Sequence, residues 1–324
     1  MKIIFNKGSE YPWCWSNSLG NELMHLSQNE GENDICLCFG LDTLNKGENY
    51  IKNLLNKYDK VCFLDVSQHT LLLDKNFTKY FKVLKLFSHI FLNNKYTVEL
   101  YRNFLNLKNV SHIKVGFPIN SIKYNKYKNT EISQKKIDLI HSGGIYSKFH
   151  FEMIEVMKKY NYIFTSYNKQ NFFGKWTWNP FFSINQKKIE QHDRIMELQS
   201  QSKAAICINN NFLNNQLQNL LAKKYELSKL DSKIIPEHKG RMFELAATKT
   251  LMVVKYDKWK VIEDYLTPEK EFLYYYSLED LTLKIKDIVN NYENYWTIIE
   301  NAYEKISEYT PIKMISFIKN KLKI

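Results

Sequence analysis

Arg241 and Glu244 lie three residues apart in KGRMFELAATKTLMVV (239–254), a short helix-forming segment that leads into an apolar run. Residues three apart share one face of a helix, so both side chains can act on a single ligand. A guanidinium suits bidentate contact with phosphate oxygens, and a carboxylate can accept hydrogen bonds from two ribose hydroxyls. A helix-dipole partner or a surface ion pair explains the same residues, with a contribution of only about 0.3–1 kcal/mol.

A second candidate for phosphate chemistry is LIHSGGIYSKFHFEMIEV (139–156), where a predicted strand runs into Gly143 and Gly144. Ser147 and Lys148 follow, at the start of a predicted helix. Glycines let the backbone approach a ligand, and a helix N-terminus favours anions, to which Lys148 adds a positive charge. The spacing matches neither the dinucleotide fingerprint nor the P-loop, and a Gly pair after a strand is more often only a turn.

The first part of the chain alternates short apolar runs with amphipathic stretches. We predict helices at 50–58 and 96–107, between strands at 2–5, 34–40, 60–67, 88–94 and 111–118. Strands that alternate with helices indicate parallel βαβ units and therefore an α/β domain, which we place at residues 1–120.

Residues 121–136 interrupt this alternation with five Lys and one Glu, which favours a solvated interdomain linker. The alternation then resumes over 137–305, and a basic helix occupies 306–324. We predict an α/β protein of two Rossmann-like domains that face each other across a cleft, with the C-terminal helix returning to the first domain. Open α/β sheets bind ligands at the carboxyl ends of their strands.

Composition limits the classes of protein and of partner. The chain has 324 residues and a net charge of +12, which is consistent with anionic partners and also with simple solubility. Its five Cys are an odd number, so we expect core thiols rather than a disulfide framework. We find neither a membrane-spanning apolar run nor a signal peptide, and we therefore expect a cytoplasmic protein. Because the chain contains no Asp-x-Asp triplet, we expect a metal-independent site.

Four segments in a fixed order give a resemblance to the nucleotide-sugar half of GT-B glycosyltransferases. They are HSGG…SKFH, DRIMELQSQSKAAICINNN, KGRMFELAATKTLMVV and EKEFLYYYSLEDLTLKIKDIV, and the resemblance covers residues 137–310. The sequence looks closest to the CgeB-like branch, glycosyl transferases group 1. The resemblance implies that Glu244 binds the ribose or sugar of the donor and that the diphosphate is held by Gly143, Gly144, Lys148 and Arg241. Ser147 is a further candidate for binding the donor.

Two positions depart from that family pattern. Glu237 precedes Glu244 with six residues between them, whereas many retaining relatives have seven. Lys249 stands where relatives usually have Gly, and a left-handed Lys costs about 1–2 kcal/mol relative to Gly.

The first domain is expected to supply the acceptor site and any general base. FLDVSQHTLLL (63–73) places Asp65 and His69 at the end of a strand. The unperturbed pKa of His69, about 6.5, suits proton removal near neutrality, although a surface His explains it equally well. The loop SEYPWCWSNSLGNEL (9–23) contains four candidates for stacking on a sugar or hydrogen bonding to it: Trp13, Trp15, Asn17 and Ser18. Local packing is the more common role of aromatic residues in such a loop.

The stretch NFFGKWTWNPFF (171–182) holds six aromatic residues, with a packed loop as its ordinary explanation. Tyr167, a few residues earlier, is a candidate for stacking on the nucleotide base.

The leading hypothesis is a hexosyltransferase of polysaccharide biosynthesis that uses a nucleotide-diphosphate sugar and no other cofactor. Its acceptor would be a glycan or a lipid-linked glycan. The alternatives are a transferase that modifies nucleic acid, as some phage enzymes do, and a non-catalytic nucleotide-sugar or glycan-binding protein. The basic amphipathic C-terminal helix PIKMISFIKNKLKI also allows peripheral contact with the inner face of a membrane.

Overall fold

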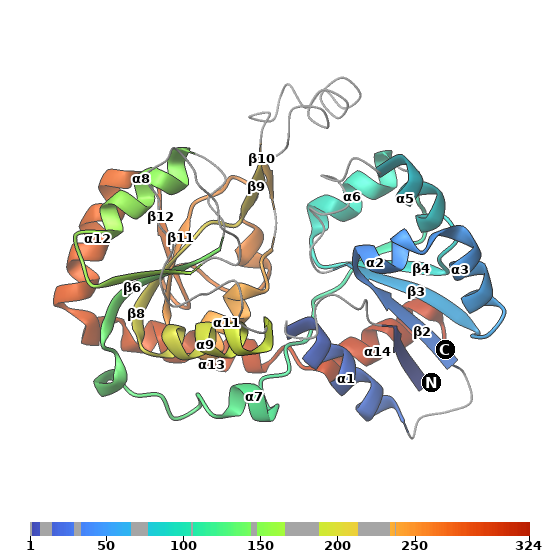
Figure 1. Cartoon of the computed structure of the whole chain (residues 1–324), viewed down its shortest axis with the longest axis horizontal. Helices are drawn as coiled ribbons and strands as arrows, with labels where there is room; N and C mark the ends of the chain where they lie inside the picture. The colour runs from blue at the N-terminus through green and yellow to red at the C-terminus, as the bar shows by residue number, and fades with distance from the viewer. Residues whose placement is uncertain are drawn as a thin grey trace. The chain divides into compact units, whose positions relative to one another are not determined.

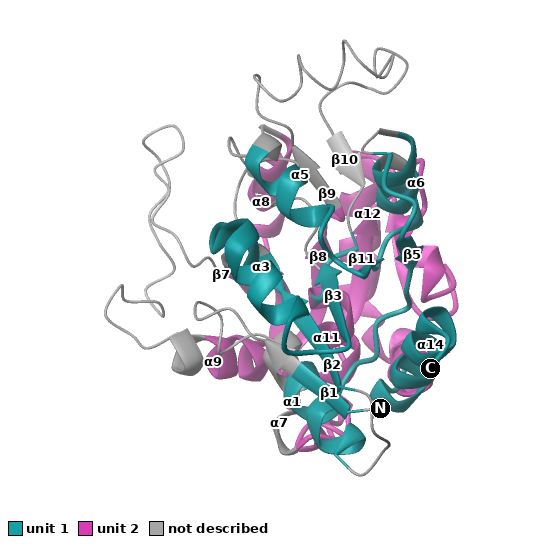
Figure 2. Cartoon of the chain, turned by 90° about the vertical axis from the view of Figure 1, so that its right-hand side faces the viewer, with its two compact units in different colours: residues 1–118, 210–240, 309–324 teal, residues 119–209, 241–308 magenta. Residues whose placement is uncertain are grey.

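The computed structural model describes residues 2–6, 15–28, 34–65, 77–104, 106–143, 148–165, 188–212, 234–236 and 238–324. The chain forms two compact units, which Figure 2 distinguishes by colour. Unit 1 comprises residues 1–118, 210–240 and 309–324, and unit 2 comprises residues 119–209 and 241–308. The sequence-based division differs, because it kept 210–240 with the second domain and treated 121–136 as a linker.

Unit 1 contains a parallel five-stranded sheet whose spatial order follows the chain order. Its strands are β1 (Lys2–Asn6), β2 (Asp34–Phe39), β3 (Lys60–Asp65), β4 (His89–Leu92) and β5 (Val110–His112). The helices between them are α1 (Trp15–Ser27), α2 (Gly40–Asn45), α3 (Gly47–Leu55), α5 (Phe77–Leu84) and α6 (Lys95–Phe104). A parallel sheet is covered on both faces, which explains why strands such as DICLCF are apolar almost throughout.

Two further pieces complete unit 1. β9 (Asn210–Phe212) and β10 (Ile234–Pro236) pair antiparallel. α14 (Pro311–Leu322) begins after the cap residue Thr310 and packs against α1. The backbone N–H of Phe117 donates to the carbonyl of Tyr309 at 2.8 Å, which ties this final segment to the end of the first one. The predicted return of the C-terminal helix to the first domain is therefore confirmed.

Unit 2 contains a second parallel five-stranded sheet, in the order β12-β11-β8-β6-β7. The strands are β6 (Ile137–Ser142), β7 (Tyr162–Thr165), β8 (Ser202–Cys207), β11 (Leu251–Lys255) and β12 (Leu273–Tyr275). Figure 1 shows α8 (Lys148–Met157) and α12 (Leu278–Asn290) on one side of this sheet. The other side carries α9 (Lys188–Ser200), α11 (Arg241–Ala247) and α13 (Trp296–Ser307). Shorter helical turns are α7 (Ile122–Asn125), η1 (Ile132–Gln134), η3 (Val261–Asp264) and η4 (Tyr292–Tyr295).

Two local predictions are wrong. The stretch expected to be an aromatic loop contains α1, so Trp15, Asn17 and Ser18 lie in a helix, while Trp13 lies outside the described residues. The expected solvated linker is packed into unit 2, because Tyr124 and Tyr127 are buried in it. The high lysine content of that segment led us to expect a solvent-exposed linker, so the burial of these two tyrosines was not predicted.

The structure also bears on the thiols and on the C-terminal helix. Four of the five cysteines are free and buried, as expected, and Cys14 lies outside the described residues. Met314, Ile315 and Ile318 of α14 are buried, whereas Ile312 is 58% exposed, and the predicted contact of this helix with a membrane stays a prediction. Within the described part of the chain, no helix has both the length and the apolarity needed to span a membrane.

Candidate functional site

Polar side chains follow the carboxyl ends of three adjacent strands in unit 2. Ser142 ends β6, Thr165 ends β7 as its register partner, and Asn209 lies two residues beyond β8. All three side chains are buried, and among the described residues the hydroxyls and the Asn209 amide have no hydrogen-bond partner. A buried polar group without a partner costs about 1–3 kcal/mol. This edge of the sheet therefore offers hydrogen-bonding groups to a ligand.

Gly143 and Arg241 meet at the same edge. Gly143 follows β6 with a φ of 147°, and its N–H donates to the carbonyl of Thr165 at 2.8 Å. A Cβ atom on Gly143 would lie 2.9 Å from both terminal nitrogens of the Arg241 guanidinium. The backbone conformation favours glycine, and a side chain at this position would displace the guanidinium. The two residues were predicted independently as diphosphate ligands, and the fold places them in contact.

Glu244 lies one turn after Arg241 in α11 and is held by a histidine from α9. The Nε2 atom of His192 lies 2.7 Å from Oε1 of Glu244, and both side chains are largely buried, with 3% and 10% exposed. Among the described residues, this contact through Oε1 is the one hydrogen bond recorded for the Glu244 carboxylate. One carboxylate oxygen is therefore fixed by the protein while the other can accept a hydrogen bond from a ligand.

Lys255 brings a second cation to this edge, at the end of β11. Its ammonium group lies 5.0 Å from the ring centre of Phe149 and 5.6 Å from that of Tyr275, and it donates to the carbonyl of Tyr276. Burial lowers the pKa of Lys255, while the carboxylate of Asp280 opposes that shift. Phe149 belongs to the first turn of α8, so Lys255 connects the end of β11 with the beginning of that helix.

Sequence reasoning missed His192, Lys255 and the three unpaired polar side chains. A polar residue at the end of an apolar strand, or shortly beyond it, was the available signal for Ser142, Thr165 and Asn209. No comparable signal pointed to His192, because it lies 52 residues before Glu244 along the chain and meets it only through the packing of α9 on α11.

The other predicted site residues belong to unit 1 or lie wholly or partly outside the described residues. Asp65 ends β3 in unit 1, where its side chain is buried. Lys148 begins α8, and its side chain is not among the described parts of the structure. His69, Gly144, Ser147, Tyr167 and Glu237 lie outside the described residues, as does the aromatic stretch 171–182.

Comparison with known proteins decides the family. A sequence profile described as glycosyl transferase-like matches residues 153–319, just over half of the 324 residues. The chain belongs to the glycosyl transferase-like family. The matched region includes α9, β8, α11 and β11, and therefore His192, Arg241, Glu244 and Lys255 of the candidate site. No curated protein matches this glycosyl transferase-like chain in sequence.

Several solved structures have the same fold as this chain, although their sequence identity to it is low. Anabaena HepE in complex with UDP and glucose has a TM-score of 0.56 and 12% identity, over 100% of this chain and 99% of HepE. The DNA-modifying enzyme β-glucosyltransferase has a TM-score of 0.57 and 13% identity, over 100% of both chains. Staphylococcus aureus TarM has a TM-score of 0.53 and 13% identity, over 94% of this chain and 59% of TarM. The glycosyl transferase-like chain therefore has the GT-B fold, as predicted.

Proposed function

We propose that this glycosyltransferase moves a hexose from a UDP-sugar to a hydroxyl group of a glycan or of a lipid-linked glycan. The observation that carries the proposal is the contact between Gly143 and the Arg241 guanidinium at the carboxyl edge of the unit 2 sheet. A glycine that lets the backbone approach closely, together with a guanidinium at the start of a helix, suits a diphosphate. Glu244, one turn further along, suits the ribose hydroxyls.

The bonds that form and break in the transfer reaction define the role of each side chain. The acceptor oxygen forms a bond to the anomeric carbon, the bond from that carbon to the diphosphate oxygen breaks, and UDP leaves. Negative charge grows on the departing diphosphate, so the positive charge of Arg241 stabilises the transition state more than the ground state. The acceptor hydroxyl loses its proton to a general base, for which we retain Asp65 and His69 in unit 1. We propose that no metal ion takes part.

The choice of UDP is supported by the likeness to HepE, which was solved with UDP and with UDP-glucose. The fold alone is compatible with other nucleotides, so the proposal rests on the site and on this likeness together. We retain the CgeB-like branch, a role in polysaccharide biosynthesis and a cytoplasmic location as parts of the same proposal.

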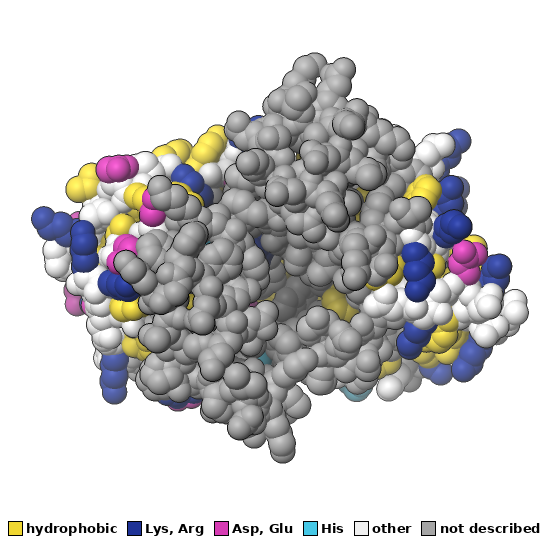
Figure 3. Space-filling model, turned by 45° about the horizontal axis from the view of Figure 1, so that its top comes forward, with side chains coloured by type: hydrophobic (Ala, Val, Ile, Leu, Met, Phe, Trp, Pro, Cys, Tyr) yellow, Lys and Arg dark blue, Asp and Glu magenta, His cyan; other side chains and the backbone are white. Residues whose placement is uncertain are grey.

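A second acceptor class is nucleic acid, which the likeness to the DNA-modifying β-glucosyltransferase favours. Figure 3 shows Lys and Arg side chains among hydrophobic, acidic and uncharged ones at the margins of the view, where the side chains are described. Nucleic-acid binding through phosphate contacts would weaken steeply with salt, whereas recognition of a neutral glycan would not. We place the glycan first, and the salt dependence of acceptor binding distinguishes the two acceptor classes.

Turnover tests the proposal. The purified protein is incubated with UDP-glucose, UDP-galactose or UDP-N-acetylglucosamine and with a glycan, a lipid-linked glycan or duplex DNA, and both UDP release and product mass are measured. We expect one UDP-sugar to yield UDP and an acceptor heavier by one sugar residue, with loss of activity in Arg241→Ala. UDP binding without turnover for any acceptor would instead favour the non-catalytic alternative.

A further inference from the structure

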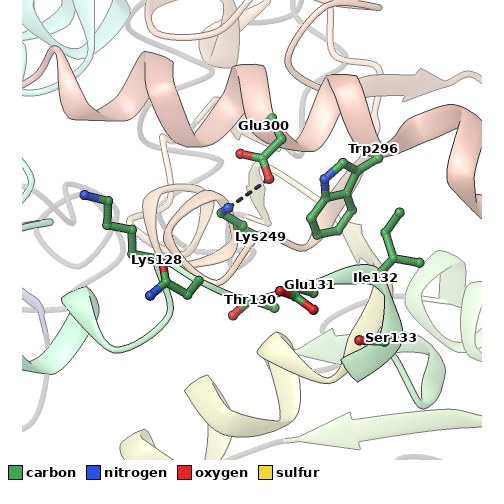
Figure 4. Close-up of a pocket in the computed structure, with 9 residues that line it drawn as sticks. Lys128, Thr130, Glu131, Ile132, Ser133, Lys249, Trp296 and Glu300 are labelled. Carbon is green, nitrogen blue, oxygen red and sulfur yellow. Dashed lines mark hydrogen bonds and ion pairs between the residues drawn. The ribbon is translucent and has the colours of Figure 1, made fainter.

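Unit 2 contains a pocket of about 560 Å³ that does not belong to the candidate donor site (Figure 4). One wall is the segment 128–133, and the other is made by Lys249, Trp296 and Glu300. Lys249 lies just beyond the C-terminal end of α11, whereas Arg241 and Glu244 lie in the first turn of that helix. Seven helical residues span about 10 Å, so the pocket and the donor site are at opposite ends of α11.

Lys249 is held in the pocket at a cost to the backbone. Its φ is 52°, in the left-handed region that glycine occupies at a lower free energy than other residues do. Its side chain is only 10% exposed, and its ammonium lies 2.8 Å from Oε1 of Glu300. The Lys135 ammonium in turn donates to the carbonyl of Lys249 at 2.6 Å. Backbone strain of this kind clusters at functional sites, which makes the Lys249 side chain a candidate for ligand binding.

Trp296 and Glu300 lie one turn apart in α13 and therefore share one face of the helix. The ring of Trp296 packs edge-on against Tyr292, at 6.4 Å between centroids. Figure 4 shows its indole beside Ile132 and the pair formed by Lys249 and Glu300. The pocket thus combines an aromatic surface with an ammonium and a carboxylate fixed next to it.

The chemistry of the lining indicates the kind of ligand. Lys128 and Lys249 are balanced by Glu131 and Glu300, so the lining has no net charge to attract a phosphate or a nucleic acid. The rest of the lining adds the hydroxyls of Thr130 and Ser133 and the amide of Asn129, which both donate and accept hydrogen bonds. A sugar ring has an apolar C–H face that can stack on an indole, and hydroxyls that can bind a paired carboxylate and ammonium. The volume lies in the range of small-ligand sites, about 300–1,000 Å³.

We infer that this pocket is a second binding site for a neutral oligosaccharide, separate from the donor site. It would hold a glycan at unit 2 whether or not that glycan is the acceptor of the reaction. The inference rests on the pocket itself and does not require the proposed transferase activity.

Calorimetric titration with maltohexaose, cellohexaose and chitohexaose tests the inference. We expect at least one of them to bind with a millimolar or lower dissociation constant. The affinity should fall about tenfold or more in Trp296→Ala and in Glu300→Gln, because these variants remove the stacking surface and the carboxylate. Glu300→Gln is nearly isosteric at a partly exposed position, so it reports on binding even if Trp296→Ala fails to fold.

Two control variants separate the pocket from the rest of unit 2. Trp259→Ala removes a partly exposed Trp outside the pocket, and Arg241→Ala alters the donor site. Both should leave the oligosaccharide affinity unchanged. The inference is overturned if none of the three oligosaccharides binds at millimolar concentration, or if one binds equally well to wild type, Trp296→Ala and Glu300→Gln. UDP binding, measured on the same samples, reports separately on the proposed function.

Discussion

The imidazole Nε2 of His192 lies 2.7 Å from Oε1 of Glu244, and this contact joins α9 to α11 inside unit 2. A free glutamate side chain has several rotamers, so a buried hydrogen-bond partner reduces the entropy that a ligand must overcome when it binds the carboxylate. His192 is therefore a positioning residue, which acts on the donor through Glu244.

Replacement of His192 is expected to weaken binding only of nucleotides that carry ribose hydroxyls. In His192→Phe the carboxylate loses its partner, and we expect the affinity for UDP to fall about tenfold or more, the usual value of a hydrogen bond to a charged group. The affinity for 2′,3′-dideoxyuridine diphosphate should not change. Calorimetric titration measures both. His192→Gln, which can still donate a hydrogen bond, should retain most of the affinity; an equal loss for both nucleotides would mean that His192 only stabilises the fold.

A methyl group on Gly143 is expected to displace the Arg241 guanidinium. The new Cβ atom of Gly143→Ala would lie 2.9 Å from two guanidinium nitrogens, and the flexible arginine would move away. We expect both a loss of stability of about 1–2 kcal/mol, from the positive φ, and a weaker affinity for UDP.

Gly47→Ala provides the matched control for Gly143→Ala. Gly47 has a φ of 81° and nothing within 4 Å of its Cβ position, so this variant carries backbone strain without displacing a guanidinium. Both variants should show a lower denaturation midpoint, but only Gly143→Ala should show weaker UDP binding. Unchanged UDP affinity in Gly143→Ala would separate Gly143 from the donor site.

Lys135 predicts a pH dependence of stability. Burial, together with the nearby positive charge of Lys249, lowers the pKa of Lys135 to about 7, from 10.5 for an ordinary lysine. Between these two values the unfolded chain binds more protons than the folded one, so the free energy of unfolding rises with pH. The slope from this one group is up to about 1.4 kcal/mol per pH unit.

Urea denaturation at pH 7 and pH 9 tests this expectation. Relative to Lys135→Met, which carries no titrating group at this position, the wild type should gain stability as the pH rises. Parallel pH dependence of the two proteins would show that Lys135 keeps an ordinary pKa.

The alternation of apolar and polar segments was sufficient to predict the five strands of the unit 1 sheet and the α/β class of both units, but it did not predict β12, α5 or α9. The sequence also indicated Gly143, Arg241 and Glu244 as candidate site residues, because their types and local spacing suit the binding of a diphosphate and a ribose. Contacts made only by tertiary packing, such as His192 with Glu244, left no local signal. Lysine-rich composition concealed the buried Tyr124 and Tyr127, and aromatic and small residues near position 15 concealed the start of α1. Lys249, which stands where relatives usually have Gly, has a φ of 52°, so this position does adopt the left-handed conformation that glycine favours.

The most direct test of the donor site is the melting temperature of wild type, Arg241→Ala and Glu244→Ala in the presence of UDP, GDP, CMP or ADP. A ligand at about one hundred times its dissociation constant stabilises the folded state by about 2.7 kcal/mol, which is readily measured. We predict that UDP raises the melting temperature of the wild type more than the other nucleotides do, and that both substitutions abolish the increase. If no nucleotide stabilises the wild type at millimolar concentration, or if UDP stabilises all three proteins equally, the assignment of Arg241 and Glu244 to the donor site is wrong.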